Sequence, residues 1–217
     1  MPGAWEQQHK VMVGILHTEN TSMPWSLAFR NLIVPGNIIV PVSGMPYDMA
    51  RNTICMKALE FGCTSCFMLD SDVACPHDTI LRLLRHNLPI VSGMYSRRSP
   101  PHGLPVMIKN GTWFTNFKRG SLVEVDLVGA GCLLIRRDVL ENMPPQRPGH
   151  HWFDWRVNMQ GLAPRDYCLS EDFTFCKAAK DTMGIKTMVD TSIECRHVGL
   201  AEATFGNFKP AESTPVT

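Results

Sequence analysis

The sequence lacks long apolar runs, and it lacks an excess of charge of either sign. No stretch approaches the roughly 18 consecutive apolar residues of a membrane-spanning helix, and the first ten residues, MPGAWEQQHK, lack the apolar centre of a secretory signal. The 21 basic residues face 20 acidic ones, so the formal net charge is +1. This balance argues against a chain-wide nucleic-acid surface, although a local basic patch at Arg97-Arg98 or Lys118-Arg119 stays open. We expect a soluble, cytoplasmic protein without a membrane span.

Cysteine is too sparse for a disulfide scaffold, with eight residues in a chain of 217. Cys63 and Cys66, followed by Cys75 and His77, raise the alternative of a zinc site. Zinc ligands must converge within about 2.0–2.3 Å of the ion, whereas the extended segment 67–69 and the turn after it would hold Cys66 and Cys75 apart. Reduced, mostly buried cysteines are the better interpretation. The length indicates a single compact domain spanning residues 1–217.

Short apolar runs alternate with helical patterns in the first half of the chain. This alternation predicts an α/β fold with a mainly parallel sheet flanked by helices, and turn signals across 105–128 predict a small antiparallel addition. Strands are expected at 11–16, 37–42, 67–69, 89–94, 132–135, 187–189 and 193–197, and helices at 47–61, from 78 to before Pro89, at 137–142 and at 171–183. The tail after Gly199 is expected to be irregular.

The stretch CFMLDSDVACPHD, residues 66–78, ends an apolar run in two carboxylates. Side chains two apart in an extended segment point the same way, so Asp70 and Asp72 can aim at one point, and ligands of open α/β sheets bind beyond the carboxyl ends of strands. Two like charges held together need a cation, and oxygen ligands favour Mg²⁺ or Mn²⁺. A diphosphate is the natural second partner of that cation. A solvated turn is the alternative.

Five segments in order resemble GT-A-fold glycosyltransferases of the family-2-like, short form found in phage and bacterial genomes. They are RNTICMKALEFG at 51–62, LDSDV at 69–73, VDLVGAGCLLIRRDVLE at 125–141, SEDFTFCKAAKDTMGIKTMVD at 170–190 and CRHVG at 195–199. The resemblance covers roughly residues 11–199. It implies a GT-A-type (Rossmann-like) fold, with 1–104 as the nucleotide-sugar-binding half and 105–217 as the acceptor half, and it implies transfer of a hexose from a nucleotide sugar.

The resemblance assigns the metal and part of the donor site. Asp72 is expected to bind Mn²⁺ or Mg²⁺ directly, with His197 as a further protein ligand. Asp70 is expected to bind the ribose, together with Ser71, or to reach the metal through water. A histidine ligand would favour Mn²⁺, although His197 could equally be a packed residue at a strand end.

Other donor contacts are expected around these ligands. The loop Thr18-Glu19-Asn20 after the first strand is the expected wall for the base, and Arg51 is expected to reach the nucleotide. Arg97 and Arg98 could clamp the diphosphate, contact the acceptor, or be solvated loop residues. UDP is the expected nucleotide and glucose the first candidate for the sugar, both as family expectations.

Glu171-Asp172 is a second acidic pair at an expected helix start. Acids at that place favour the helix dipole by about 0.3–1 kcal/mol, so a structural role is sufficient by itself. The resemblance instead implies that Asp172 lies near the anomeric carbon, with Glu171 as backup. It would be the general base of an inverting enzyme, or would bind the donor sugar in a retaining one.

Small and aromatic residues complete the expected site. Gly129-Ala130-Gly131 would let a donor approach closely, although a tight strand crossing explains these residues too. Trp152, Phe153 and Trp155 are candidates for stacking on an acceptor sugar, and buried packing is the alternative for at least one of them. The acceptor itself is open between a saccharide, a small molecule and a modified nucleic-acid base.

Two other functions compete with glycosyl transfer. A sugar nucleotidyltransferase would carry a Gly-rich loop after the first strand, but the sequence there reads GILHTENTSMPW. The other is a non-catalytic sugar- or nucleic-acid-binding module. The two acidic pairs argue against it, because carboxylates held together without a metal ion are electrostatically unfavourable.

Overall fold

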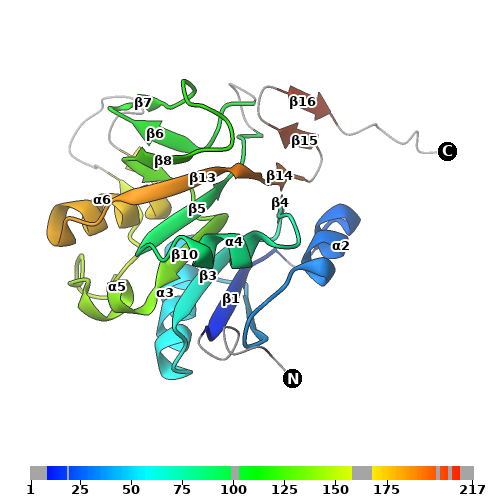
Figure 1. The fold of residues 1–217 in the computed structure, drawn as a ribbon. Helices are drawn as coiled ribbons and strands as arrows, with labels where there is room; N and C mark the ends of the chain where they lie inside the picture. Colours follow the sequence, from blue (N-terminus) through cyan, green and yellow to red (C-terminus); the bar gives the residue numbers. More distant parts are fainter. Residues whose placement is uncertain are drawn as a thin grey trace.

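The chain folds around one mixed β-sheet of seven strands (Figure 1). The computed structural model describes residues 9–18, 20–98, 103–157, 168–198, 201–204 and 207–210. The strand order is β2-β1-β3-β10-β5-β13-β8. The strands are β1 (Val11–Leu16), β2 (Ile38–Val42), β3 (Ser65–Asp70), β5 (Ile90–Met94), β8 (Leu122–Val125), β10 (Cys132–Arg136) and β13 (Thr187–Glu194).

Five of these strands run in one direction. The pairs β1–β2, β1–β3 and β5–β13 are parallel, whereas β10 is antiparallel to both β3 and β5 and lies between them. The edge strand β8 is antiparallel to β13. The carboxyl ends of β1, β3, β5 and β13 therefore meet at one edge of the sheet, where open α/β sheets bind their ligands.

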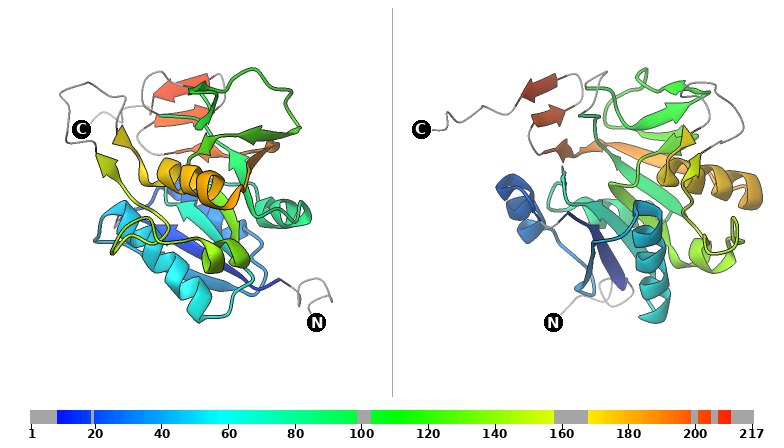
Figure 2. Two further views of the ribbon diagram at one scale, coloured as in Figure 1. Left: turned by 90° about the vertical axis from the view of Figure 1, so that its left-hand side faces the viewer. Right: turned by 180° about the vertical axis from the view of Figure 1, so that it is seen from behind.

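Helices cover both faces of the sheet. The helices are α2 (Met23–Asn31), α3 (Tyr47–Glu60), α4 (Thr79–Arg85), α5 (Arg137–Asn142) and α6 (Glu171–Met183). Residues of α3, α5 and α6 share one hydrophobic cluster, and residues of α2 and α4 share the other. Accordingly, α4 lies in front of the sheet in Figure 1, and α3 lies in front in the view from behind in Figure 2.

The alternation of side chains along each strand explains this double coverage. On β3, Cys66 and Met68 pack in the cluster beneath α3, whereas Phe67 and Leu69 pack in the cluster beneath α4. A strand buried on both faces reads as a continuous apolar run, as the sequence shows at 66–69. Cys75 lies in the α4-side cluster, so the sheet separates it from Cys66.

Three small antiparallel sheets are added to the central sheet. The first contains β6 (Met107–Lys109), β7 (Thr112–Trp113) and β9 (Leu127–Val128), and the second pairs β11 (Arg156–Val157) with β12 (Cys168–Leu169). The third contains β4 (Val73–Ala74), β14 (Arg196–His197), β15 (Ala201–Thr204) and β16 (Asn207–Pro210). The predicted fold class is confirmed: a mixed, mainly parallel α/β sheet flanked by helices, with small antiparallel additions.

Several elements of the structure were not predicted from the sequence. The tail expected to be irregular contains β15 and β16, which extend the sheet edge formed by β14, because an open strand edge offers unpaired backbone groups to the segment that follows. Helix α2 was not predicted, although Ser22 at its start accepts a hydrogen bond from the Trp25 backbone N–H at 3.3 Å. None of the described helices has the length and apolar character needed to cross a lipid bilayer.

Candidate active site

The acidic pair lies in the turn that ends β3. Asp70 is the last residue of β3, and Ser71 and Asp72 form the turn between β3 and β4. The Trp25 indole N–H donates to the Asp70 backbone carbonyl at 2.9 Å, and the Val198 N–H donates to the Asp72 carbonyl at 2.7 Å. Helix α2 and the segment after β14 thus fix the backbone of this turn at the carboxyl edge of the sheet.

Two cavities meet at this turn, and both have Asp70, Asp72 and Arg98 in their walls. The first has a volume of about 500 Å³ and the second about 530 Å³, within the usual range of ligand pockets. The other residues of the first wall are Leu16, His17, Thr18, Asn20, Ser22, Tyr47, Arg51, Ser71, Trp155, Glu171, Asp172 and Val198. The second is completed by Tyr95, Arg97, Val106 and His197.

Asp72 has two basic partners on one oxygen. Its Oδ2 lies 2.6 Å from Arg98 Nη2 and 3.2 Å from His197 Nε2. Burial raises the pKa of the Asp72 carboxyl, but the hydrogen bond and charge of His197, together with the charge of Arg98, outweigh this effect and hold the pKa below its usual value. The carboxylate is therefore ionised at neutral pH and available as a ligand.

Asp72 and His197 fit a divalent cation. The Nδ1 of His197 lies 2.8 Å from the Ser96 carbonyl oxygen, which can only accept, so Nδ1 carries a proton. A backbone carbonyl on the second ring nitrogen is the usual support of a metal-binding histidine. The lone pair of a neutral imidazole would then lie on Nε2, facing Asp72, and two acceptors 3.2 Å apart require a proton or a metal ion beside them.

Arg51 is a buried cation between two acids. It comes from α3, and its Nη2 lies 3.0 Å from Asp70 Oδ1 while its Nε lies 3.1 Å from Glu171 Oε1. Burial alone would lower the pKa of Arg51, but Asp70, Glu171 and Asp172 raise it overall. The Asp70 carboxyl has a raised pKa, because its burial outweighs the attraction of Arg51. This network connects the acid turn of β3 to the start of α6.

Asp172 combines burial with access to the first cavity. Its Oδ1 accepts hydrogen bonds from the Ser170 hydroxyl and, at 2.8 Å, from the Phe173 N–H. Burial and the neighbouring Glu171 charge raise its pKa to about 6, against the lowering effects of Arg51 and Ser170. A carboxylate with this pKa is largely ionised at pH 7 and still basic enough to accept a proton, which suits a general base.

The glycines at 129 and 131 fit closely around Tyr95. A Cβ on Gly129 would lie 2.0 Å from the Tyr95 hydroxyl oxygen, and a Cβ on Gly131 would lie 3.0 Å from Asp70 Oδ2. The Gly131 N–H donates to the same hydroxyl at 3.1 Å. Ala130 is fully buried, and its carbonyl accepts from Arg51 Nη1 at 3.3 Å. Packing behind the acid turn is thus sufficient to require small residues at 129 and 131, and the donor contact expected of this segment stays a prediction.

We expect Gly129→Ala to lower the free energy of unfolding by about 1–3 kcal/mol, because the new methyl group overlaps Tyr95. Denaturant unfolding measures this cost. In a Tyr95→Phe background the nearest overlapping atom is gone, so the same substitution should cost less. Equal costs in the two backgrounds would contradict the proposed contact.

Most predicted donor and catalytic residues come together. Thr18, Asn20, Arg51, Asp70, Ser71, Asp72, Arg98, Glu171 and Asp172 all lie in the wall of the first cavity, and Arg97 and His197 lie in the wall of the second. The guanidinium carbon of Arg97 lies 4.6 Å from the Trp113 ring centre. Glu19 lies outside the described residues.

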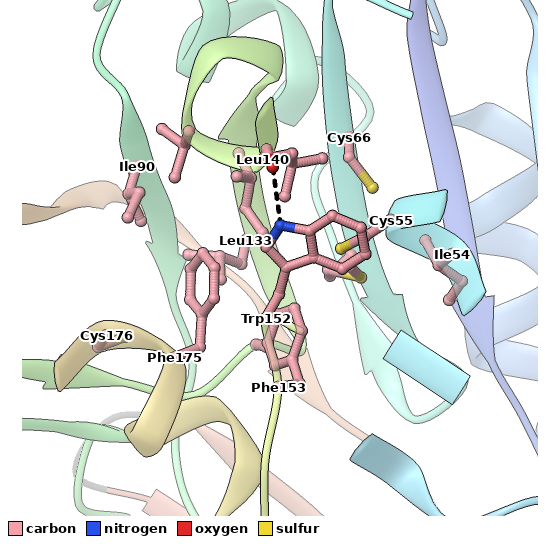
Figure 3. Close-up of a cluster of buried hydrophobic side chains, with 14 of the residues drawn as sticks. Ile54, Cys55, Cys66, Ile90, Leu133, Leu140, Trp152, Phe153, Phe175 and Cys176 are labelled. Carbon is pink, nitrogen blue, oxygen red and sulfur yellow. Dashed lines mark hydrogen bonds between the residues drawn. The ribbon is translucent and has the colours of Figure 1, made fainter. Parts of the chain in front are cut away.

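Two of the three predicted acceptor aromatics are core residues, which corrects their assignment (Figure 3). The Trp152 indole N–H donates to the Leu140 carbonyl at 2.9 Å, and the Phe153 ring stacks on Phe175 with centroids 4.5 Å apart. Phe153 is fully buried and Trp152 is 4% exposed, so neither offers a face to a sugar. Trp155, 43% exposed, remains in the wall of the first cavity.

The sequence prediction missed Tyr47, His17 and Ser22 in the first cavity and Tyr95 in the second. Tyr47 begins α3 and is 59% exposed. The signal was its position directly after Pro46, beyond the carboxyl end of a predicted strand, where site residues of α/β proteins gather. Tyr95 follows β5 in the same way.

Two further groups among the described residues could hold a metal ion by their spacing. One contains the buried residues Cys75, Cys132 and Cys195. The Cys195 Sγ lies 3.4 Å from Cys75 Sγ and 3.6 Å from Cys132 Sγ. The other contains Asp48, His150 and Asp154. Asp154 already faces the guanidinium groups of Arg147 and Arg156 at 2.6 and 3.1 Å. Its charge is therefore balanced without a metal.

No family model matches the sequence, and no curated protein does. Among solved structures, A197 from STIV is similar over 96% of this chain and 97% of its own, with a TM-score of 0.62 and 14% identity. A CMP:2-keto-3-deoxy-manno-octonic acid synthetase complexed with CTP aligns over 83% of this chain and 88% of its own, with a TM-score of 0.44 and 11% identity. A glycosyltransferase involved in glycosylation of the major capsid of PBCV-1 aligns over 60% and 61%, with a TM-score of 0.35 and 14% identity. At these identities, the likeness to A197 shows a shared fold over nearly the full length of both chains.

Proposed function

We propose that the protein is a metal-dependent glycosyltransferase that moves a hexose from a UDP-sugar, with UDP-glucose as first candidate, to an acceptor hydroxyl. One observation carries this proposal: Asp72, paired with His197, and Asp172, with a pKa of about 6, line one concave site at the carboxyl edge of the sheet. A cation-binding group and a general base are the two functions that metal-dependent, inverting glycosyl transfer from a diphosphate requires.

Asp72 and His197 would hold the cation, and Asp70 would contribute through water or through the ribose. Mn²⁺ is preferred over Mg²⁺ because imidazole is a ligand of transition metals. When bound, the cation supplies Lewis-acid stabilisation of the leaving diphosphate. The loop residues Thr18 and Asn20, together with Tyr47, provide the wall for the nucleoside.

Asp172 would take the proton of the acceptor hydroxyl. Its hydrogen bonds from Ser170 and Phe173 orient the carboxylate, and Glu171 is held on Arg51 and so acts as a positioning residue. In a retaining enzyme, Asp172 would instead bind the hydroxyls of the donor sugar. Trp155 offers an exposed aromatic face to the acceptor.

The properties of Asp172 also bear on the rival activity. In a sugar nucleotidyltransferase the nucleophile is a phosphate oxygen of the sugar phosphate. That oxygen is already ionised near neutral pH, so the reaction needs no general base. An acceptor hydroxyl does need one. Incubation with UDP-glucose and Mn²⁺, compared with UTP, glucose 1-phosphate and Mn²⁺, separates the two activities: release of UDP supports the transferase, and release of diphosphate supports the rival. If neither is released with any nucleotide sugar tested, the protein is a binding module.

Asp72→Asn is expected to weaken Mn²⁺-dependent binding of UDP by at least about 100-fold, since even indirect supports of metal ligands are worth about 10–100-fold. Calorimetric titration of UDP with and without Mn²⁺ measures this effect. Asp78→Asn is the matched control, because Asp78 is a nearby carboxylate that pairs with Arg82. Unchanged Mn²⁺-dependent affinity in the Asp72 variant would exclude the proposed metal site.

A further inference from the structure

Arg98 occupies a position that a bound cation would also require. Its Nη2 lies 2.6 Å from Asp72 Oδ2, the same oxygen that faces His197 Nε2 at 3.2 Å. A metal ion held by Asp72 and His197 would share this oxygen with a guanidinium group. Two positive charges on one carboxylate oxygen repel each other, so each weakens the binding of the other.

Arg98 also has unused hydrogen-bonding capacity. A guanidinium has five N–H donors. Its Nη1 donates to the Val198 carbonyl at 3.2 Å, whereas its buried Nε has no hydrogen-bond partner among the described residues. The side chain lies in the walls of both cavities. It could therefore turn from Asp72 toward an anion in either cavity without leaving the site, and phosphate oxygens match a guanidinium better than a single carboxylate oxygen does.

We propose that Arg98 is an internal competitor of the divalent cation, holding Asp72 until metal and donor bind and then transferring its guanidinium to the diphosphate. This inference rests on the proposed function. It makes the binding of cation and donor interdependent, because the cation releases Arg98 and the diphosphate gives Arg98 a new partner. By linkage, each ligand then raises the affinity of the other by the same factor.

The test is direct titration of Mn²⁺ into the donor-free protein, followed by electron paramagnetic resonance. Loss of the competing charge in Arg98→Ala is expected to tighten Mn²⁺ binding about tenfold, the size of a charge-assisted hydrogen bond. Arg98→Lys keeps the charge and should keep wild-type affinity. Arg136→Ala removes the same charge from a solvent-exposed pair with Asp138, outside the walls of both cavities, and should change Mn²⁺ affinity by less than about threefold. Thermal unfolding verifies that each variant is folded.

A second titration examines the other half of the exchange. With saturating Mn²⁺, Arg98→Ala should bind UDP about tenfold more weakly than the wild type, since a charge-assisted contact to the diphosphate is lost. Opposite changes in Mn²⁺ and UDP affinity support the exchange. A decrease in both, or no change in Mn²⁺ affinity, overturns it.

Asp72→Asn separates failure of this inference from failure of the proposed function. If Asp72→Asn abolishes Mn²⁺ binding but Arg98→Ala leaves the affinity unchanged, the metal site stands and Arg98 is not a competitor. If the wild type and Asp72→Asn bind Mn²⁺ equally, the metal site itself is wrong, and both proposals fall.

Discussion

Replacing Asp172 with asparagine is expected to reduce turnover about 10²–10⁴-fold, the usual contribution of a general base. The amide keeps the shape of the side chain but cannot accept the proton of an acceptor hydroxyl. Rates of UDP release in the presence of acceptor measure the effect. Asp181→Asn is a matched control on the same helix, because Asp181 is exposed and pairs with Lys177 at 2.7 Å, and its rate should equal that of the wild type.

The pH profile of the wild type provides an independent measurement. A general base must be ionised, so kcat/KM should rise as the pH passes the pKa of Asp172, about 6, and level off above it. Burial raises this pKa the most and the Glu171 charge raises it further, whereas Arg51, Ser170 and the Phe173 N–H lower it. A flat profile between pH 5 and 7, or an effect of Asp172→Asn confined to KM, would assign Asp172 to sugar binding instead.

As the pH rises through about 6, the contribution of Asp172 to stability should fall while the activity rises. The pKa of Asp172 is raised from 3.8 to about 6 on folding, so folding favours the protonated form. The resulting stabilisation is complete below the unfolded pKa and is lost as the pH rises through about 6. At pH 8 the wild type contains a half-buried, ionised carboxylate, and Asp172→Asn should unfold at the same or a higher temperature. A clear decrease in its melting temperature at pH 8 would show that Asp172 is mainly structural.

Replacing Arg51 with methionine is expected to lower the free energy of unfolding by about 3–5 kcal/mol at pH 7, because breaking a buried ion pair leaves its partner without compensation. Asp70 and Glu171 would both lose their cation. In a domain of this size such a loss lowers the melting temperature by about 6–20 °C. Thermal and denaturant unfolding measure the two quantities.

The control for Arg51 is Arg136→Ala, which removes a solvent-exposed pair with Asp138 and should cost no more than about 1 kcal/mol. The difference in free energy of unfolding between the wild type and the Arg51 variant should also become smaller as the pH falls. Without Arg51, the burial that already raises the Asp70 pKa acts unopposed, and protonation removes the uncompensated charge. A variant as stable as the wild type at pH 7 would show that the network does not hold the acid turn to α6.

Local patterns in the sequence were sufficient for the fold class and for most of the site. The apolar run at 66–69, buried on both faces, marked a central strand, and the acids after it lie at the carboxyl edge of the sheet, in the walls of both cavities. Helix α6 spans 171–183 as predicted, and Gly184, with a φ of +66°, follows its last residue. These features depend on neighbours within a few residues, which a single sequence displays.

Contacts across large sequence separations were decided only by the tertiary structure. Nothing local distinguishes Trp152 and Phe153, which are buried, from Trp155, which is exposed, and nothing local indicates that β10 enters the sheet antiparallel between β3 and β5. The ion pairs Arg51–Glu171 and Arg98–Asp72 join residues 120 and 26 positions apart. Periodicity and caps specify each element, but which side chains meet is set by how the elements pack, because burial and charge pairing are energies of the assembled structure.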